Sequence, residues 1–407
     1  HTDVTAAAAT VALGLLYLRS NDAEVATCLA VPPTISGLEH VRPDLLLLRV
    51  ACRNLILWEG ISPTSEWVEA QVPGYVGEVA DVVLSSGSMQ AVSSLSHSEK
   101  FAKVIHAVQN QLSDFGNSAS DADVDGVINA WVSIITGACF AMGLRYAGSA
   151  DKMAYRTLLH YMDLFIRATS LPANSFENKI LRTALKAGLN VLCTSICCVM
   201  AGTGNLEVLK RLRRLHGRVS DTTTYGDHMA VHMALGLLFL GGGQYTLDNS
   251  NRAVVALFCA LYPRYPSRPN DNRPHLQVFR HLWVLAAEPR CFVVRETDTC
   301  RPVYAPISVV TKNSSDMGTG DGNEEILELV APCLLPDLRK IKSIIINSPR
   351  YWPIKLDFIA NDFAEMIRMA RPVFVKERPG HLDFVNVRAS GLPRWIRLSG
   401  PPYAHCV

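Results

Sequence analysis

The sequence lacks the side-chain patterns on which common enzymes and structural zinc sites depend. It contains 11 cysteines but no Cys-x-x-Cys pair, no Gly-x-Ser-x-Gly motif, and no carboxylate pair within an apolar segment. These absences exclude a paired-cysteine zinc site and the nucleophile turn of a hydrolase. We therefore expect neither an enzyme activity nor a cofactor.

Charge is scarce as well. Charged residues make up 19% of the chain and the formal net charge is +2, which is too small to indicate a nucleic-acid partner. One basic cluster stands out at 210–218, and a solvated helix face is its simplest interpretation. The alternative is a partner-binding surface made of Lys210, Arg211, Arg213 and Arg214.

Uninterrupted apolar runs are short in this sequence, although 49% of the residues are hydrophobic. The most apolar stretches, 187–201 and 233–243, fall short of the roughly 20 residues of a membrane span. We therefore expect no membrane partner. No signal peptide is evident, and the chain begins at His1 without a methionine, so we expect a piece of a longer protein. Cysteines inside apolar runs favour a reducing compartment; they are Cys139, Cys193, Cys197, Cys198 and Cys259.

The feature that dominates the sequence is an internal repeat. Val11–Leu18 reappears as Met233–Leu240, with six of eight positions identical, and weaker copies occupy Phe140–Gly148 and Ser195–Gly202. The repeat anchors fall at 14, 143, 197 and 236, and their shortest spacing, 39 residues, is typical of a helix-turn-helix unit. The sequence therefore predicts a helical repeat array.

Small residues recur at fixed places in these repeats. Glycine inside a helix costs roughly 0.5–1 kcal/mol relative to alanine, so its repetition indicates places where a neighbouring helix approaches closely. We expect Gly236 to lie at such a contact and Gly242 to lie in a turn. Glycines that end the apolar runs are expected in the left-handed conformation. The repeat signature consists of Ala12, Gly14, Ala141, Gly143, Gly148, Gly202, Ala234, Gly236 and Gly241.

Each apolar segment is followed by a one-sided helix, at 151–168, 205–216 and 251–262. The apolar helices should form an inner layer and the one-sided helices an outer layer. In 205–216 the leucines at three-residue intervals should face inward, leaving the basic residues outward; these are Leu206, Leu209, Leu212 and Leu215.

The chain divides into two predicted parts. Residues 1–290 should be the helical array, with an irregular insertion at about 72–123 that contains a helix near 99–113, and a last helix at 275–287. Residues 291–407 should be a smaller β-rich module, because the hydrophobic period changes to two. In it we expect one helix at 360–370, a loop at 313–323, and strands at 291–295, 303–312, 340–347, 354–358, 373–376 and 381–387.

Two motifs offer chemistry, and both have a simpler interpretation. His228 and His232 have the spacing of a zinc pair, but Met229 stands where a metalloprotease has glutamate, and no third ligand is signalled. We therefore expect no metal site. Gly202-Thr203-Gly204 precedes a helix like a phosphate loop, but it follows a helix rather than a strand, which favours an inter-helix turn.

The repeat core, Ala-x-Gly with a glycine five residues later, resembles the proteasome/cyclosome repeat. The likeness is to the cyclosome group of that family and extends over most of 1–388. It is carried by His1–Thr5, Leu46–Trp58, Met200–Leu212, His232–Tyr245, Leu257–Tyr262, His281–Arg290 and Pro349–Trp352. The resemblance implies a mainly α fold with two concentric helix layers in a full or partial toroid.

The same resemblance implies a function. Cyclosome members are non-catalytic scaffolds of the anaphase-promoting complex, a ubiquitin ligase that drives mitosis. The implied partners are other subunits of that complex and a coactivator, without a small-molecule substrate, and the implied location is the nucleus and cytoplasm. One alternative is a proteasome regulatory-particle subunit that binds ubiquitin or ubiquitin-like domains. A weaker alternative is a metal-dependent enzyme using His228 and His232.

Overall fold

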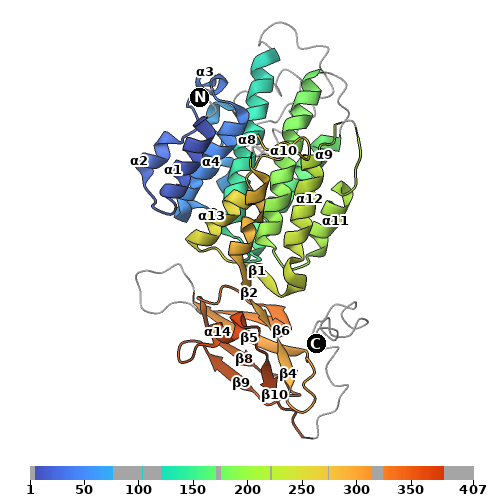
Figure 1. Cartoon of the computed structure of the whole chain (residues 1–407). Helices are drawn as coiled ribbons and strands as arrows, with labels where there is room; N and C mark the ends of the chain where they lie inside the picture. The colour runs from blue at the N-terminus through green and yellow to red at the C-terminus, as the bar shows by residue number, and fades with distance from the viewer. Residues whose placement is uncertain are drawn as a thin grey trace. The chain divides into compact units, whose positions relative to one another are not determined.

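The computed structural model describes residues 5–76, 103, 121–170, 176–220, 222–273, 275–312 and 324–379. The chain forms two compact units (Figure 1). The helical unit comprises His1–Leu238 and Asn249–Ala286, and the β unit comprises Phe239–Asp248 and Ala287–Val407. The predicted fold class, a helical repeat array followed by a β-rich module, is confirmed.

The helical unit contains long apolar helices and shorter amphipathic ones. Its elements are α1 (Thr5–Leu16), α2 (Ala23–Cys28), α3 (Ile35–Glu39), α4 (Pro43–Ile56), η1 (Trp58–Gly60), α5 (Ser65–Glu69), α8 (Asp121–Arg145), α9 (Lys152–Ser170), α10 (Phe176–Val199), α11 (Leu206–Leu215), α12 (Tyr225–Leu238), α13 (Asn251–Ala260) and η3 (Gln277–Ala286). The helix predicted at 275–287 is the 3-10 helix η3.

Local sequence explains where several helices begin. Asn205 precedes α11, and its side-chain oxygen accepts from the backbone N–H groups of Glu207 and Val208. Ser250 accepts from the N–H of Ala253 at the start of α13, and Pro43 occupies the first turn of α4. These residues satisfy or remove N–H donors that have no partner within the helix.

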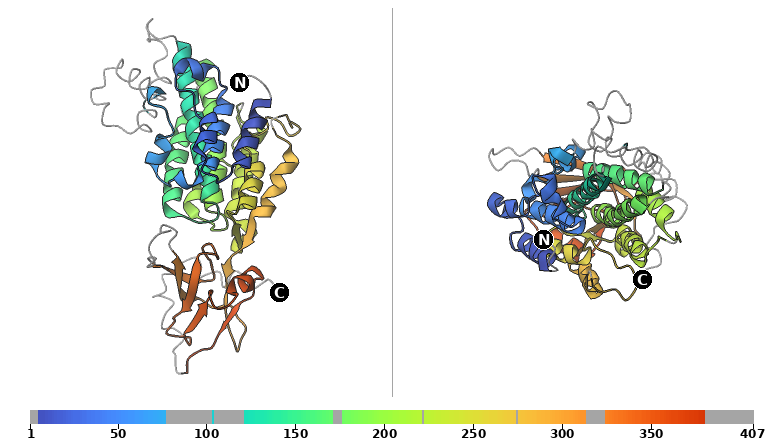
Figure 2. Two further views of the ribbon diagram at one scale, coloured as in Figure 1. Left: turned by 90° about the vertical axis from the view of Figure 1, so that its left-hand side faces the viewer. Right: turned by 90° about the horizontal axis from the view of Figure 1, so that it is seen from above.

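Helices α1, α4, α8, α10 and α12 follow one another in a curved layer (Figure 2, right). α9 packs against α10, and α11 contacts both α10 and α12. α8 and α10 are long and apolar enough to cross a membrane by length and composition alone, but 94% and 67% of the respective segments are buried inside the protein. Both serve as core helices of this unit.

A pair of backbone hydrogen bonds, here called the ladder, joins α1 to α4, α8 to α10, and α10 to α12. The last carbonyl groups of a helix have no partner within it. Here they accept from N–H groups in the turn of the preceding repeat, five and seven residues after its anchor. In each of the six bonds the backbone N–H of the first residue donates to the carbonyl oxygen of the second, and the distance is from N to O. The bonds are Arg19 to Leu55 (3.0 Å), Asn21 to Ile56 (3.0 Å), Gly148 to Cys198 (2.9 Å), Ala150 to Val199 (3.0 Å), Gly202 to Leu237 (3.0 Å) and Gly204 to Leu238 (2.9 Å).

This ladder reveals a repeat that the sequence comparison missed. In α10 and α12 the accepting carbonyls lie one and two residues after the anchors at 197 and 236. In α4 they belong to Leu55 and Ile56, so Asn54 occupies the anchor position. A buried asparagine is unlike glycine in sequence, and its amide donates to the Val50 carbonyl and to Gln71.

The β unit is built on a four-stranded antiparallel sheet in the order β6-β5-β8-β9. Its strands are β5 (Ala305–Lys312), β6 (Glu324–Ala331), β8 (Ile341–Ile346) and β9 (Ile354–Asp357). Three two-stranded pairs and a helix complete it: β1 (Tyr245–Leu247) with β2 (Ala287–Pro289), β3 (Cys291–Phe292) with β7 (Cys333–Leu334), β4 (Val294–Glu296) with β10 (Val373–Val375), and α14 (Phe363–Arg368).

The structure adds to the predicted β elements. Strand β6 was not predicted, because three glutamates in eight residues obscure its alternation; it pairs with β5 along its whole length. The segment Phe239–Asp248, from within the range expected to be helical, supplies β1 and the 3-10 turn η2 (Leu240–Gly243). Several predictions lie outside the described residues: the helix near 99–113 and most of the 72–123 insertion, the loop at 313–323, and the strand at 381–387.

Arg290 is a buried cation of the β unit, with 3% of its side chain exposed and Glu288 at 3.0 Å. It also donates to the Leu247 carbonyl. Replacing Arg290 with leucine should lower the free energy of unfolding by roughly 3 kcal/mol, because it leaves a carboxylate and a carbonyl poorly paired. The matched change Arg368→Leu removes a more exposed ion pair to Glu288, at 3.4 Å, and should cost less than about 1 kcal/mol. Equal losses in urea denaturation would contradict this account.

Candidate functional site

The repeat glycines of α1 and α8 lie where two backbones meet. A Cβ atom built on Gly14 would be 2.5 Å from the Cβ of Cys52 in α4. One built on Gly143 would be 2.8 Å from the Cβ of Ser195 in α10. Both partners sit two residues before the anchor of the next repeat, so the close approach and the hydrogen-bond ladder belong to the same repeated interface.

The prediction for Gly236 was wrong. A Cβ atom on this residue would meet nothing within 4 Å among the described atoms, and the residue is exposed. Gly236 resembles Gly14 in its sequence context but does not make the same kind of helix–helix contact. In the described chain, no following repeat helix packs against the face of α12 that bears Gly236. Ala141 and Ala234 are fully buried, whereas Ala12 is exposed.

The turn glycines adopt left-handed backbone angles, with φ of 61° at Gly148, 76° at Gly202 and 56° at Gly241. The N–H groups of Gly202 and Gly204 donate to the carbonyls that end α12. These donors are therefore engaged in the ladder rather than available as a phosphate loop. Gly242 also has a positive φ, 64°, inside η2.

The basic side chains of α11 do not form one free surface. Arg211 is paired with Asp163 of α9 at 2.8 Å and with Glu207 at 3.1 Å, and Lys210 pairs with Glu207 at 2.6 Å. The side chains of Arg213 and Arg214 are exposed and make no ion pair with another described residue. The expectation that all four leucines face inward was wrong for Leu206, which is 53% exposed because it begins the helix.

His228 and His232 lie on one face of α12, with ring centroids 6.4 Å apart. The structure brings His216, at the end of α11, to 5.0 Å from His232, a neighbour that spacing along the chain could not reveal. In the part of the chain that the structure describes, no group of three or more His, Cys, Asp or Glu residues is arranged to hold a metal ion.

The core cysteines are buried small side chains. Cys139, Cys193, Cys197 and Cys198 are at most 1% exposed. Burial raises the pKa of Cys193 and of Cys198 to about 12. Since the thiolate is the reactive form, these thiols are chemically quiet at neutral pH.

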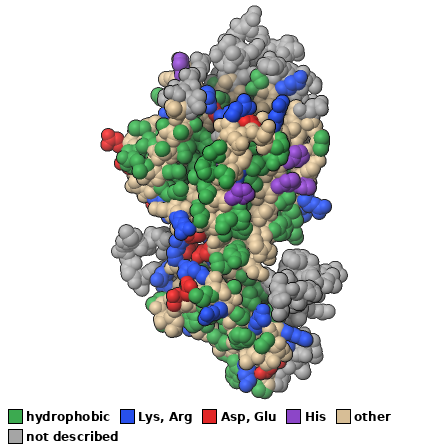
Figure 3. Space-filling model, in the orientation of Figure 1, with side chains coloured by type: hydrophobic (Ala, Val, Ile, Leu, Met, Phe, Trp, Pro, Cys, Tyr) green, Lys and Arg blue, Asp and Glu red, His purple; other side chains and the backbone are tan. Residues whose placement is uncertain are grey.

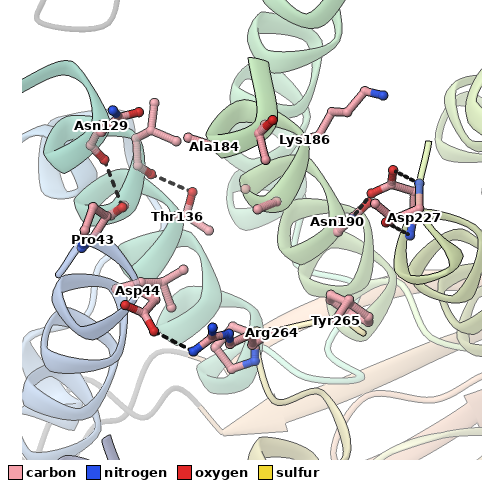
Figure 4. Close-up of a pocket in the computed structure, with 18 of the residues that line it drawn as sticks. Pro43, Asp44, Asn129, Thr136, Ala184, Lys186, Asn190, Asp227, Arg264 and Tyr265 are labelled. Atoms are coloured by element: carbon pink, nitrogen blue, oxygen red, sulfur yellow. Dashed lines mark hydrogen bonds and ion pairs between the residues drawn. The ribbon is translucent and has the colours of Figure 1, made fainter. Parts of the chain in front are cut away.

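The structure also contains a pocket that the sequence did not signal (Figure 4). Its volume is about 710 Å³, and α4, α8, α10, α12 and the segment 262–267 line it. At one end Asp44 meets Arg264 at 2.7 Å; at the other, Asn190 donates to Asp227 at 2.7 Å. Burial raises the pKa of Asp44, but the guanidinium groups of Arg42 and Arg264 outweigh it and hold that pKa below its ordinary value.

Several polar groups of the pocket lining already have partners within the protein. Both carboxylates are already engaged, and the described lining contains neither cysteine nor histidine. The hydroxyls of Ser133 and Thr136 donate to carbonyls of their own helix, those of Asn129 and Val132.

Comparison with known proteins identifies the family. The model of the APC1 fifth domain matches residues 1–288, and that of the APC1 beta sandwich domain matches residues 290–378. The chain belongs to the APC1 family. A negative regulator of mitosis from Emericella nidulans is 41% identical over 359 residues, covering 88% of this chain and 15% of that protein.

Other APC1 relatives agree. Anaphase-promoting complex subunit 1 of Dictyostelium discoideum is 40% identical over 374 residues, covering 90% of this chain and 16% of the relative. The Homo sapiens subunit is 38% identical over 386 residues, covering 94% of this chain and 18% of the relative. The chain thus spans about a sixth of the length of these relatives. The resemblance inferred from the repeat motifs is confirmed, and it selects the cyclosome group over the proteasome alternative.

The corrected glycine contacts lead to a test. Gly143→Ala should lower the free energy of unfolding by about 1–3 kcal/mol, because the new methyl group collides with Ser195. Gly236→Ala should raise it by about 0.5–1 kcal/mol, because the site is open and alanine favours the helix. Chemical denaturation measures both, and a loss at Gly236 similar to that at Gly143 would contradict the contacts described.

The ion pairs of α11 lead to a second test of stability. Arg211→Glu should destabilise the helical unit by roughly 1–2 kcal/mol, because it sets a carboxylate against Asp163 and Glu207. Arg213→Glu makes the same charge change on the same helix, at a residue that has no ion pair to lose. Its free energy of unfolding should stay within about 0.5 kcal/mol of that of the parent chain. Thermal melting distinguishes the two, and an unchanged midpoint for Arg211→Glu would show that the pair contributes nothing.

Proposed function

We propose that this chain is part of a non-catalytic scaffold subunit of the anaphase-promoting complex, the ubiquitin ligase of mitosis, and that it holds other subunits in place. The observation that carries the proposal is the match of the APC1 fifth-domain model to residues 1–288, together with relatives named as subunit 1 of that complex. A location in the nucleus and cytoplasm, and contact with a coactivator, belong to the same proposal.

The surfaces support a scaffold role. Repeat arrays offer extended exposed faces because each repeat contacts only its neighbours. Large apolar side chains of the helical unit are exposed, among them Leu16, Val278 and Val284 at 80%, 66% and 57%. Figure 3 shows hydrophobic side chains gathered on the face of this unit that is in view. Patches of this kind mark protein interaction sites. The α12 face bearing Gly236 adds a further helix surface without a neighbour in the described chain.

The proposal is tested by affinity purification of the tagged chain with mass spectrometry of its partners. Other subunits of the anaphase-promoting complex should co-purify, and the chain alone should not transfer ubiquitin. Capture of proteasome regulatory-particle subunits instead, or ubiquitin transfer by the chain alone, would overturn it.

The α11 surface can be tested in the same experiment. The variant combines Arg213→Glu with Arg214→Glu and leaves Arg211 unchanged, because the ion pairs of Arg211 support the fold. We expect this folded variant to capture fewer partners than Lys152→Glu with Arg156→Glu, an equal charge change on α9, whose side chains are also exposed. Equal capture by both variants would exclude this surface and leave the scaffold role intact.

A further inference from the structure

A second cleft of the helical unit gathers positive charge. It has a volume of about 560 Å³ and lies between the end of α9, the middle of α10, the segment after α11, and the start of α12. Arg182 and Lys186 come from α10, and Arg218 comes from the segment after α11. Hydroxyl groups of Ser170, Ser220, Thr222 and Thr223 lie around them.

Two of the three cations are held in place by the fold. The Lys186 ammonium donates to the carbonyl and hydroxyl oxygens of Thr222, at 3.0 and 2.9 Å. In Figure 4 its side chain points away from the Asp44–Arg264 pair. Arg182 donates to the Thr169 carbonyl at 3.2 Å. Burial lowers the pKa of Lys186 and the charges of Arg182 and Arg218 lower it further, against the opposing effect of Asp227. Lys186 is therefore affected by the charges of both arginines that share its cleft.

Asp227 is the one carboxylate among the described lining residues, and its oxygens are already used. One accepts from the Asn190 amide at 2.7 Å, and the other accepts from the N–H of Thr224 at 2.9 Å. The Arg218 side chain is exposed and makes no hydrogen bond or ion pair to another described residue. The described lining thus holds three cations and one carboxylate, and the Arg218 guanidinium has donors available to a ligand; Asp221 lies outside the described residues.

We propose that this cleft binds a phosphorylated serine or threonine side chain of a partner protein. Clustered guanidinium and ammonium groups match the charge and the acceptor oxygens of a phosphate group. Recognition of phosphorylated peptides by clustered arginines is a common mode of docking. The inference goes beyond the proposed scaffold function and does not require it.

The rest of the lining favours a peptide over a nucleic acid. Apolar side chains of Leu189, Leu215, Val219 and Val231 border the cations and suit the residues next to a phosphorylated one. The described lining has no Phe, Tyr or Trp on which nucleic-acid bases could stack, whereas single-stranded nucleic acids depend on such stacking.

The test measures binding to the whole 407-residue chain. The probe is a fluorescein-labelled degenerate peptide library with a fixed central phosphoserine, followed by fluorescence anisotropy, with the unphosphorylated library alongside. We expect the phosphorylated library to bind at least about 10-fold more tightly, and inorganic phosphate to compete. Equal binding of the two libraries would overturn the proposal.

Variants locate the site. Arg218→Gln should weaken binding of the phosphorylated library by about 10-fold or more without changing the melting temperature, because the side chain has no described partner to lose. Lys186→Gln should weaken it similarly, and Arg213→Gln on the neighbouring α11 should leave it unchanged. An unchanged affinity of the Arg218→Gln variant for the phosphorylated library would refute the peptide site. Tighter binding of a polyuridine oligonucleotide than of the phosphorylated library would also refute it.

Discussion

The helical unit depends on one repeated interaction, in which backbone N–H groups of one turn cap the final carbonyls of the next helix. These carbonyls would otherwise lack partners within their own helices, and a buried unpaired carbonyl is costly. The bonds form only if the helices approach closely enough, which is what Gly14 and Gly143 permit. Positive φ angles at Arg19, Gly148 and Gly202 direct the donors toward the neighbouring helix. The small residues at the helix contacts, the turns with positive φ and the backbone hydrogen bonds thus form one repeated interface.

This repeated interface determines which side chains of the helical unit remain at its surface. Because the core helices satisfy one another through backbone groups, the side chains of the outer helices and of the cleft edges are left for other uses. Arg211 is used within the fold to tie α11 to α9, whereas Arg213, Arg214 and Arg218 are exposed. The buried cysteines fill space and stay protonated. A scaffold needs this division, since its surfaces can change without disturbing the layer that holds them.

The sequence predicted the repeat family, the helical array and most of the strands from local patterns. Its failures share a cause. Asn54 occupies an anchor position although it resembles no other anchor, because the ladder uses backbone atoms and constrains the side chain only through packing. Gly236 looks like Gly14 but faces open space, because contact depends on whether another helix follows. Strand β6 is held by pairing with β5 along its whole length, and its glutamates obscure that pattern in the sequence.

The sequence by itself determined that this is an APC1-like chain, since periodic apolar residues and repeated small residues are local properties that one chain records directly. The tertiary structure alone decided which of these residues meet. It brought Arg211 to Asp163, placed His216 beside His232, and gathered Arg182, Lys186 and Arg218 from separate elements into one cleft. Such groupings join residues far apart in the chain. Their distances follow from how whole helices pack, which no short stretch of sequence encodes.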